Sequence, residues 1–211
     1  MKGSIYLIGG GEIGKGETAK IDNELIEITP ADKTLVFFGT AAGDNREYIN
    51  TIESVFKSNL KVIAPTEKDG PEFALSSINS ASIIYLGGGT TELLLNLFEK
   101  WRLVQPLRHA LSRGAHLVGM SAGAQALSAW YVHEDENSME LRRGWGFVSS
   151  CILVHADQNS SAQAEVLWGD SQDANQNPFI AIGEGAAWRV NPSGALKIGT
   201  GKIWHSKITE S

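Results

Sequence analysis

The amino-acid sequence predicts an α/β protein with a mostly parallel sheet covered by helices on both faces, a three-layer αβα arrangement. Short apolar runs alternate with segments whose apolar residues recur at helical spacing, and this alternation is typical of α/β folds. Glycine-rich turns follow three of the apolar runs, at residues 9–11, 39–43 and 87–89. Ligands of such sheets bind at the carboxyl ends of the strands, so we expect these turns to share one functional face.

The first half of the chain supplies most of the elements. We expect strands at residues 4–8, 34–38, 60–64, 83–86 and 117–120, and helices at 21–28, 46–58, 91–101 and 104–113. Each strand is a short apolar run that stops at a polar or glycine-rich segment. The helices show the i, i+3, i+4 recurrence of apolar residues that places one face against a core.

The second half is less regular. Residues 131–137 are expected to form a charged loop, 152–155 a strand, and the polar stretch 157–177 carries only a poorly marked helix. Two more strands are expected at 179–182 and 187–190. The turn residues Asn191-Pro192-Ser193-Gly194 then predict a C-terminal β-hairpin. Without a repeat or a linker, the sequence predicts a single domain over residues 1–211.

Composition excludes several classes of function. The 211 residues are 42% hydrophobic and carry a net charge of −6, without the Lys/Arg cluster that nucleic-acid binding needs. We therefore expect no nucleic-acid partner. No apolar run approaches the length of a bilayer span and no cleavable hydrophobic leader follows Met1, so we expect no membrane partner and a cytoplasmic location. The single cysteine, Cys151, lies in an apolar run and is expected to be a buried, inert thiol.

The pentapeptide Gly119-Met120-Ser121-Ala122-Gly123 carries the strongest chemical signal. It matches G-x-S-x-G, the strand-turn-helix corner that exposes a nucleophilic serine above a sheet. Small neighbours are needed because the serine backbone is strained at such a corner. The amide groups at the start of the following helix can stabilise the oxyanion that develops during acyl transfer. The alternative interpretation is a tight structural turn with a satisfied hydroxyl.

The glycines near the N-terminus raise a competing hypothesis, nucleotide binding. Gly9, Gly11 and Gly14 satisfy G-x-G-x-x-G after a strand, but the second strand lacks the acidic residue that would hold a ribose. The same segment also resembles the P-loop motif, but Lys15 is followed by Gly16, whereas a P-loop has a magnesium-binding Ser or Thr at that position. We favour a structural role in which the glycines allow a close approach of neighbouring chain.

A serine hydroxyl needs a base, and the base needs an orienting acid. His155 should end a strand at the same edge as Ser121, which favours it over the other histidines, although His133 in the charged loop stays open. The acid is expected from Glu134, Asp135 or Glu136, which lie between serine and histidine. This order, serine, acid and histidine, is that of α/β-hydrolases.

A family resemblance adds to this interpretation. The ordered motifs Tyr85-Leu86-Gly87-Gly88-Gly89-Thr90-Thr91, Gly119-Met120-Ser121-Ala122-Gly123-Ala124 and Gly144-Trp145-Gly146-Phe147, with His155, resemble peptidase family S51, which includes aspartyl dipeptidase (peptidase E) and cyanophycinase. The resemblance implies a fold similar to that of class I glutamine amidotransferases, with serine in place of cysteine at the elbow.

The same resemblance implies roles for individual residues. Ser121 is then the nucleophile, His155 the base and Glu136 the third member, with Asp135 a close rival. The amides of Gly89 and Ala122 would form the oxyanion hole. Acid or substrate-binding roles are also open to Glu184, Gly88 and Thr90. No metal or cofactor is implied.

The substrate is less clear because the chain lacks the arginines that follow the histidine in named relatives: no Lys or Arg occurs between Arg143 and Arg189. We expect a serine peptidase that cleaves an amide bond of a small peptide or isopeptide. An esterase or amidase with the same triad and a non-catalytic binding protein that retains the elbow are the alternatives. A homodimer is compatible with this expectation.

Overall fold

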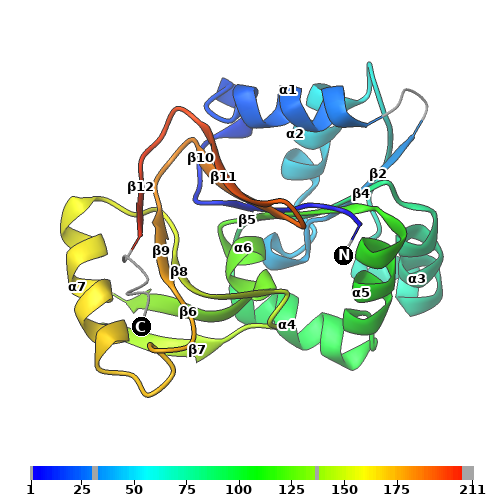
Figure 1. Cartoon of the computed structure of the whole chain (residues 1–211). Coiled ribbons are helices and arrows are strands. Elements are labelled where there is room, and N and C mark those ends of the chain that lie inside the picture. Colours follow the sequence, from blue (N-terminus) through cyan, green and yellow to red (C-terminus); the bar gives the residue numbers. More distant parts are fainter. Residues whose placement is uncertain (1, 30–32, 136–137, 206–211) are drawn as a thin grey trace.

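Within residues 2–29, 33–135 and 138–205, which the computed structural model describes, a seven-stranded sheet forms the larger part of the fold (Figure 1). Its strand order is β11-β10-β1-β5-β4-β2-β3. The strands are β1 (Ile5–Ile8), β2 (Thr34–Phe38), β3 (Lys61–Ile63), β4 (Ile83–Leu86), β5 (His116–Met120), β10 (Ala186–Asn191) and β11 (Gly194–Gly199). The five strands from β1 to β3 in this order run parallel to one another. β10 runs antiparallel to β1, and β11 runs antiparallel to β10, with which it forms the C-terminal hairpin.

Helices cover both faces of this sheet, as the sequence predicts. On one face lie α1 (Ala19–Ile28) and α2 (Arg46–Phe56); on the other lie α3 (Gly70–Ser80), α4 (Thr91–Lys100), α5 (Val104–Arg113) and α6 (Ala122–Leu127). Alternate residues of each strand face opposite layers, so Tyr6 and Ile8 pack under α1 and α2 while Ile5 and Leu7 join the other core. No helix among the described residues is long and apolar enough to span a membrane.

A second sheet lies beside the first and was not expected from the sequence. In the described part of the chain it has five strands in the order β12-β9-β8-β6-β7. They are β6 (Ser128–Asp135), β7 (Ser138–Arg143), β8 (Val148–Leu153), β9 (Phe179–Ile182) and β12 (Ile203–His205). Figure 1 shows α7 (Gln158–Gly169) on its outer side, and α4 and α6 between the two sheets.

One expectation about local structure was wrong, and one helix was missed. The segment 131–137, expected to be a charged loop, belongs in its described part to β6, which pairs antiparallel with β7. Its apolar members, Tyr131 and Val132, are buried on opposite faces of the strand, while the acidic end is exposed. The helix α3 was not predicted, because its segment begins with Gly70 and Pro71 and carries few strongly apolar residues. Pro71 is tolerated there because backbone N–H groups in the first turn of a helix have no hydrogen-bond partner within the helix, so the missing N–H of proline costs nothing.

The parallel strands bring the functional turns to one edge. The turn after β1, the loop after β4 and the corner after β5 follow neighbouring strands, and β9 and β8 of the second sheet end beside them. The amide of His155, just past β8, donates to the carbonyl of Gly9 at 3.0 Å, which joins the two sheets at this edge. The face predicted from the glycine-rich turns therefore exists.

Candidate active site

Ser121 occupies a sharp corner between β5 and α6. Its φ of +49° lies in the left-handed region, which few non-glycine residues adopt. The neighbouring glycines allow close packing: a Cβ atom on Gly123 would lie 2.2 Å from the carbonyl oxygen of Leu86, and the Ser121 amide donates to Ile8 at 2.9 Å. The corner therefore has the backbone geometry expected of a nucleophile elbow. Contacts with the neighbouring strands β1 and β4 keep this strained backbone in place.

His155, the base predicted for this serine, lies within hydrogen-bond distance of it. It lies two residues beyond the end of β8, also with a positive φ of 53°, and its Nε2 atom is 2.7 Å from Oγ of Ser121. The expected strand end is therefore slightly displaced, but the imidazole reaches the same edge as the hydroxyl. The side chain of His155 is 50% exposed, so this pair lies at the surface of an open site.

Glu184 completes the hydrogen-bonded chain of side chains. It follows β9, and its Oε1 atom lies 2.5 Å from Nδ1 of His155. Gly10 makes room for this pair, because a Cβ atom there would lie 2.4 Å from both the imidazole and the Glu184 carboxylate. The carbonyl of Gly10 also accepts the amide of Gly185 at 3.1 Å. The glycine run after the first strand thus allows His155 and Glu184 to approach the backbone closely. This is the structural role that the sequence analysis favoured over nucleotide binding.

The acids expected between serine and histidine lie elsewhere or outside the described residues. Glu136 lies outside them. Asp135 is 3.3 Å from Nε2 of His133, at the exposed end of β6. Both ring nitrogens of His155 already have partners, Ser121 and Glu184. An imidazole has two nitrogens, so a further carboxylate has no ring position left to bind.

Glu134 lies near the histidine without that role. Glu134 lies in β6, which pairs parallel with β8, and His155 follows the end of β8. Burial and the negative charge of Asp157 raise the pKa of Glu134, while His155 lowers it. Asp157 itself caps α7, where the hydroxyl and amide of Ser160 hold the pKa of its carboxyl below the usual range. This side of the site is acidic.

A cavity of about 420 Å³ opens in front of Ser121 and His155. Its walls come from the turn after β1, the start of α2 and the loop after β4: Gly10, Gly11, Glu12, Ile13, Gly14, Tyr48, Thr51, Gly88, Gly89, Met120, Ser121 and His155. Gly88 is close to the nucleophile, since a Cβ atom on it would lie 3.5 Å from Cβ of Ser121. The predicted oxyanion loop and the predicted nucleophile therefore line the same pocket.

Tyr48 was missed by the sequence reasoning. Asn45 caps α2 by accepting the amide of Tyr48 at 3.1 Å, which places Tyr48 in the first turn of the helix. The Tyr48 hydroxyl accepts the amide of Gly88 at 3.2 Å and lies 3.8 Å from Sδ of Met120. No motif marks this tyrosine, because its partners come from β4 and β5 and are distant in sequence.

The loop after β4 is held from its other side. The amide of Thr90 donates to the carbonyl of Ala41 at 2.7 Å, and Gly89 has a φ of +135°. A Cβ atom on Gly89 would lie 2.2 Å from that same carbonyl oxygen, so only glycine fits. The backbone of Gly88 and Gly89 is thus clamped between Tyr48 and Ala41.

Two basic side chains, Lys15 after β1 and Arg142 in β7, form ion pairs with acids. Nζ of Lys15 lies 2.7 Å from Oε1 of Glu12. Arg142 forms ion pairs with both Glu92 and Glu140. The Arg142 pairs are partly buried and engage its charge, whereas the Lys15–Glu12 pair is exposed and holds Lys15 only weakly.

The described residues provide neither a reactive cysteine nor a metal-binding cluster at this site. The thiol of Cys151 is buried, as expected, and burial raises its pKa, which disfavours the reactive thiolate. Within the described ranges, no group of three or more His, Cys, Asp and Glu residues is placed to hold a metal ion.

Comparison with known proteins identifies peptidases that are similar to this chain in sequence and fold. The model of peptidase family S51 matches residues 5–198. An uncharacterized peptidase of Bacillus subtilis (strain 168), YgaJ, is 27% identical over 164 residues, which cover 74% of this chain and 70% of YgaJ.

Solved structures show the same fold at low sequence identity. A peptidase from an acI-B1 actinobacterium superposes with a TM-score of 0.69 at 21% identity, covering 100% of this chain and 93% of that one. A putative peptidase E protein from Listeria monocytogenes EGD-e superposes with a TM-score of 0.68 at 14% identity, covering 94% and 98%. The mostly parallel sheet flanked by helices is therefore shared with these proteins.

Proposed function

Because the chain belongs to peptidase family S51 and is thus a serine hydrolase of the peptidase type, we propose that Ser121, His155 and Glu184 form its catalytic triad. The observation that carries this proposal is the unbroken series of contacts from Oγ of Ser121 through both ring nitrogens of His155 to Oε1 of Glu184. Glu184 takes the role that the sequence resemblance assigned to Glu136.

The geometry supports an acyl-enzyme mechanism. Oγ of Ser121 attacks the scissile carbonyl carbon while Nε2 of His155 accepts the hydroxyl proton. Glu184 holds the proton on Nδ1 and stabilises the imidazolium that forms. The tetrahedral intermediate then collapses as His155 protonates the leaving amine, and a water molecule activated by the same imidazole hydrolyses the ester to Ser121.

The amides of Gly89 and Ala122 are the proposed oxyanion donors. Ala122 is the first residue of α6, where backbone N–H groups have no partner within the helix. The loop carrying Gly89 is clamped on both sides, so little reorganisation is needed when charge develops on the carbonyl oxygen. Gly88 and Thr90 shape this loop and have no proposed chemical role.

We infer that the substrate is a short peptide or an isopeptide. The cavity is about 420 Å³, which suits a ligand of small-molecule size rather than a long extended chain. It lies at the carboxyl ends of the strands, where α/β proteins place their ligands.

Covalent labelling tests the proposal directly. We expect a fluorophosphonate to label the purified protein at Ser121, and Ser121→Ala to abolish both labelling and hydrolysis of a dipeptide panel. Cys151→Ala is the matched control and should keep activity, since its thiol is buried and unreactive. An unlabelled wild type that hydrolyses neither peptides nor esters would instead indicate a binding protein, and preferred hydrolysis of esters would indicate an esterase.

A further inference from the structure

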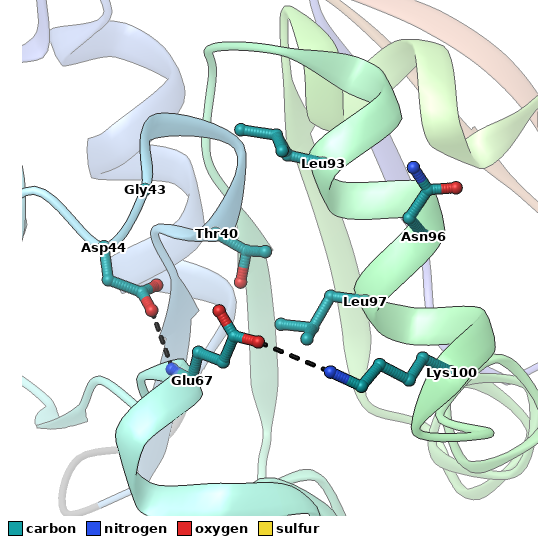
Figure 2. A pocket seen from close by; sticks show the side chains of 8 residues that line it. All are labelled: Thr40, Gly43, Asp44, Glu67, Leu93, Asn96, Leu97 and Lys100. Carbon is teal, nitrogen blue, oxygen red and sulfur yellow. Dashed lines mark hydrogen bonds and ion pairs between the residues drawn. The ribbon is translucent and has the colours of Figure 1, made fainter.

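A second pocket lies outside the candidate active site and shares no lining residue with it (Figure 2). It has a volume of about 280 Å³ and is bounded by the turn after β2, by η3 (Glu67–Asp69) and by α4. The lining residues are Thr40, Gly43, Asp44, Glu67, Leu93, Asn96, Leu97 and Lys100. The proposed mechanism uses none of them.

An unsatisfied carboxylate oxygen marks the polar wall of this pocket. Oδ2 of Asp44 accepts the amide of Glu67 at 2.7 Å, but Oδ1 is buried and has no hydrogen-bond partner among the described residues. A buried acceptor without a donor is destabilising, and because Oδ1 is buried, a ligand N–H group removes that penalty only after the carboxylate turns toward the pocket. Figure 2 shows the side chains of Thr40 and Glu67 pointing toward one another beside Asp44, so several oxygen acceptors gather in one place.

The opposite wall is apolar and belongs to one face of α4. Leu93 and Leu97 are one helical turn apart and point into the pocket (Figure 2). Leu93 is 50% exposed, which leaves its side chain available for an apolar ligand group. Leu97 is largely buried and closes the wall beneath it.

A cation lies at the far end of the same helix face. Nζ of Lys100 reaches across the pocket to within 3.6 Å of Oε1 of Glu67, and both side chains remain largely exposed. Exposed ion pairs of this kind contribute little and rearrange readily. The pocket therefore combines carboxylate acceptors, an aliphatic wall formed by Leu93 and Leu97, and the ammonium group of Lys100.

We propose that this pocket binds a free α-amino acid with an aliphatic side chain. The ligand ammonium would meet Asp44 and Glu67, its carboxylate would pair with Lys100, and its side chain would pack on Leu93 and Leu97. The source of the ligand rests on the proposed function, because hydrolysis of short peptides releases amino acids.

The turn between the two pockets links them. Ala41, next to Thr40 on the wall of the second pocket, accepts the amide of Thr90, and its carbonyl oxygen is packed against Gly89. A ligand that moves Thr40 or Asp44 consequently shifts the carbonyl that holds the oxyanion loop.

Calorimetric titration of L-leucine into the Ser121→Ala protein tests the site without turnover. We expect one equivalent to bind, with N-acetyl-leucine and isoamylamine each at least about tenfold weaker, because each lacks one charged group. Asp44→Asn and Lys100→Met should weaken L-leucine by a similar factor. The exposed Asp170→Asn and Lys57→Met, outside both pockets, are the matched controls and should bind normally.

Several outcomes would overturn this site: no binding, equal affinity in the pocket variants and the controls, or loss of leucine binding when a fluorophosphonate blocks Ser121 of the wild type. Leu93→Ser provides a variant at an exposed position in case Asp44→Asn does not fold, and it should also weaken L-leucine. The binding measurement does not need catalysis. Hydrolysis without leucine binding therefore removes only the second site, whereas leucine binding without hydrolysis removes only the proposed function.

Discussion

Nδ1 of His155 lies 2.5 Å from Oε1 of Glu184, although the two residues are 29 positions apart and belong to different loops. The contact exists because β8 and β9 are parallel neighbours in the second sheet, so the segments that follow them leave at the same edge. Gly10, from the first sheet, has no side chain to separate them. The proposed triad is thus assembled from both sheets.

Glu184→Gln tests the proposed acid. We expect kcat to fall by roughly three to four orders of magnitude, because an amide favours the wrong imidazole tautomer and cannot stabilise the imidazolium. Steady-state hydrolysis of the best dipeptide measures the effect. Asp135→Asn is the control and should change kcat less than about threefold, since Asp135 contacts His133 instead.

Glu136→Gln belongs in the same experiment, because Glu136 is the acid implied by the family resemblance. We expect a small effect from this change. A loss for Glu136→Gln as large as that expected for Glu184→Gln, with Glu184→Gln nearly active, would return the acid role to Glu136.

Tyr48→Phe tests how the oxyanion loop is positioned. The change removes the hydroxyl that accepts the Gly88 amide at 3.2 Å but keeps the partly buried ring. Misplaced oxyanion donors destabilise the transition state more than the bound substrate, so kcat should fall about tenfold with KM nearly unchanged. Tyr131→Phe, which removes a hydroxyl bonded to Glu92, serves as the control. A raised KM with normal kcat would assign Tyr48 to substrate binding.

Substrate charge provides a third prediction. Arg142 is paired with two acids, and Glu134 and Asp157 lie near His155, so a basic or neutral residue before the scissile bond should be preferred over Asp. We expect kcat/KM to follow the order Lys-Xaa, Asn-Xaa, Asp-Xaa. Glu134→Gln should reduce the preference for Lys over Asn about tenfold by removing a charge-assisted partner. A clear preference for Asp-Xaa would contradict this specificity.

Asp22 predicts how stability depends on pH. It is 3% exposed, accepts the Thr18 hydroxyl at 2.7 Å, and has a second oxygen that is buried without a partner. Burial raises its pKa to about 6 from 3.8. The folded state therefore prefers the protonated acid, and its contribution to stability is fully present below pH 4 and is lost as the pH rises through about 6.

Asp22→Asn should remove this dependence. The amide cannot ionise, so the variant should be more stable than the wild type at pH 8, by an amount on the order of 3 kcal/mol at most. The advantage should disappear near pH 4, where Asp22 is protonated. Urea unfolding of both proteins at the two pH values measures it. Parallel stability curves across this range would show that Asp22 does not titrate as described.

Local sequence alone predicted most elements of the first half of the chain and the candidate nucleophile. The ranges expected for 34–38, 83–86 and 104–113 agree with β2, β4 and α5, because apolar periodicity and adjacent glycines act over a few residues. Ser121 was identified for the same reason: an elbow needs small residues at fixed neighbouring positions, and these are visible in one pentapeptide. His155 followed from the rule that ligands gather where strands end.

The rest was decided by tertiary structure. The second sheet depends on pairing between β6, β8 and β9, and strand pairing is set by contacts between distant residues that no local pattern encodes. For the same reason the sequence order pointed to acids beside β6, whereas the carboxylate that meets His155 comes from the turn before β10. Tyr48 approaches Gly88 only because α2 packs over the strand that ends there. Local sequence predicts a serine at a corner and a histidine at a strand end; contacts between distant segments decide which acid and which tyrosine lie beside them.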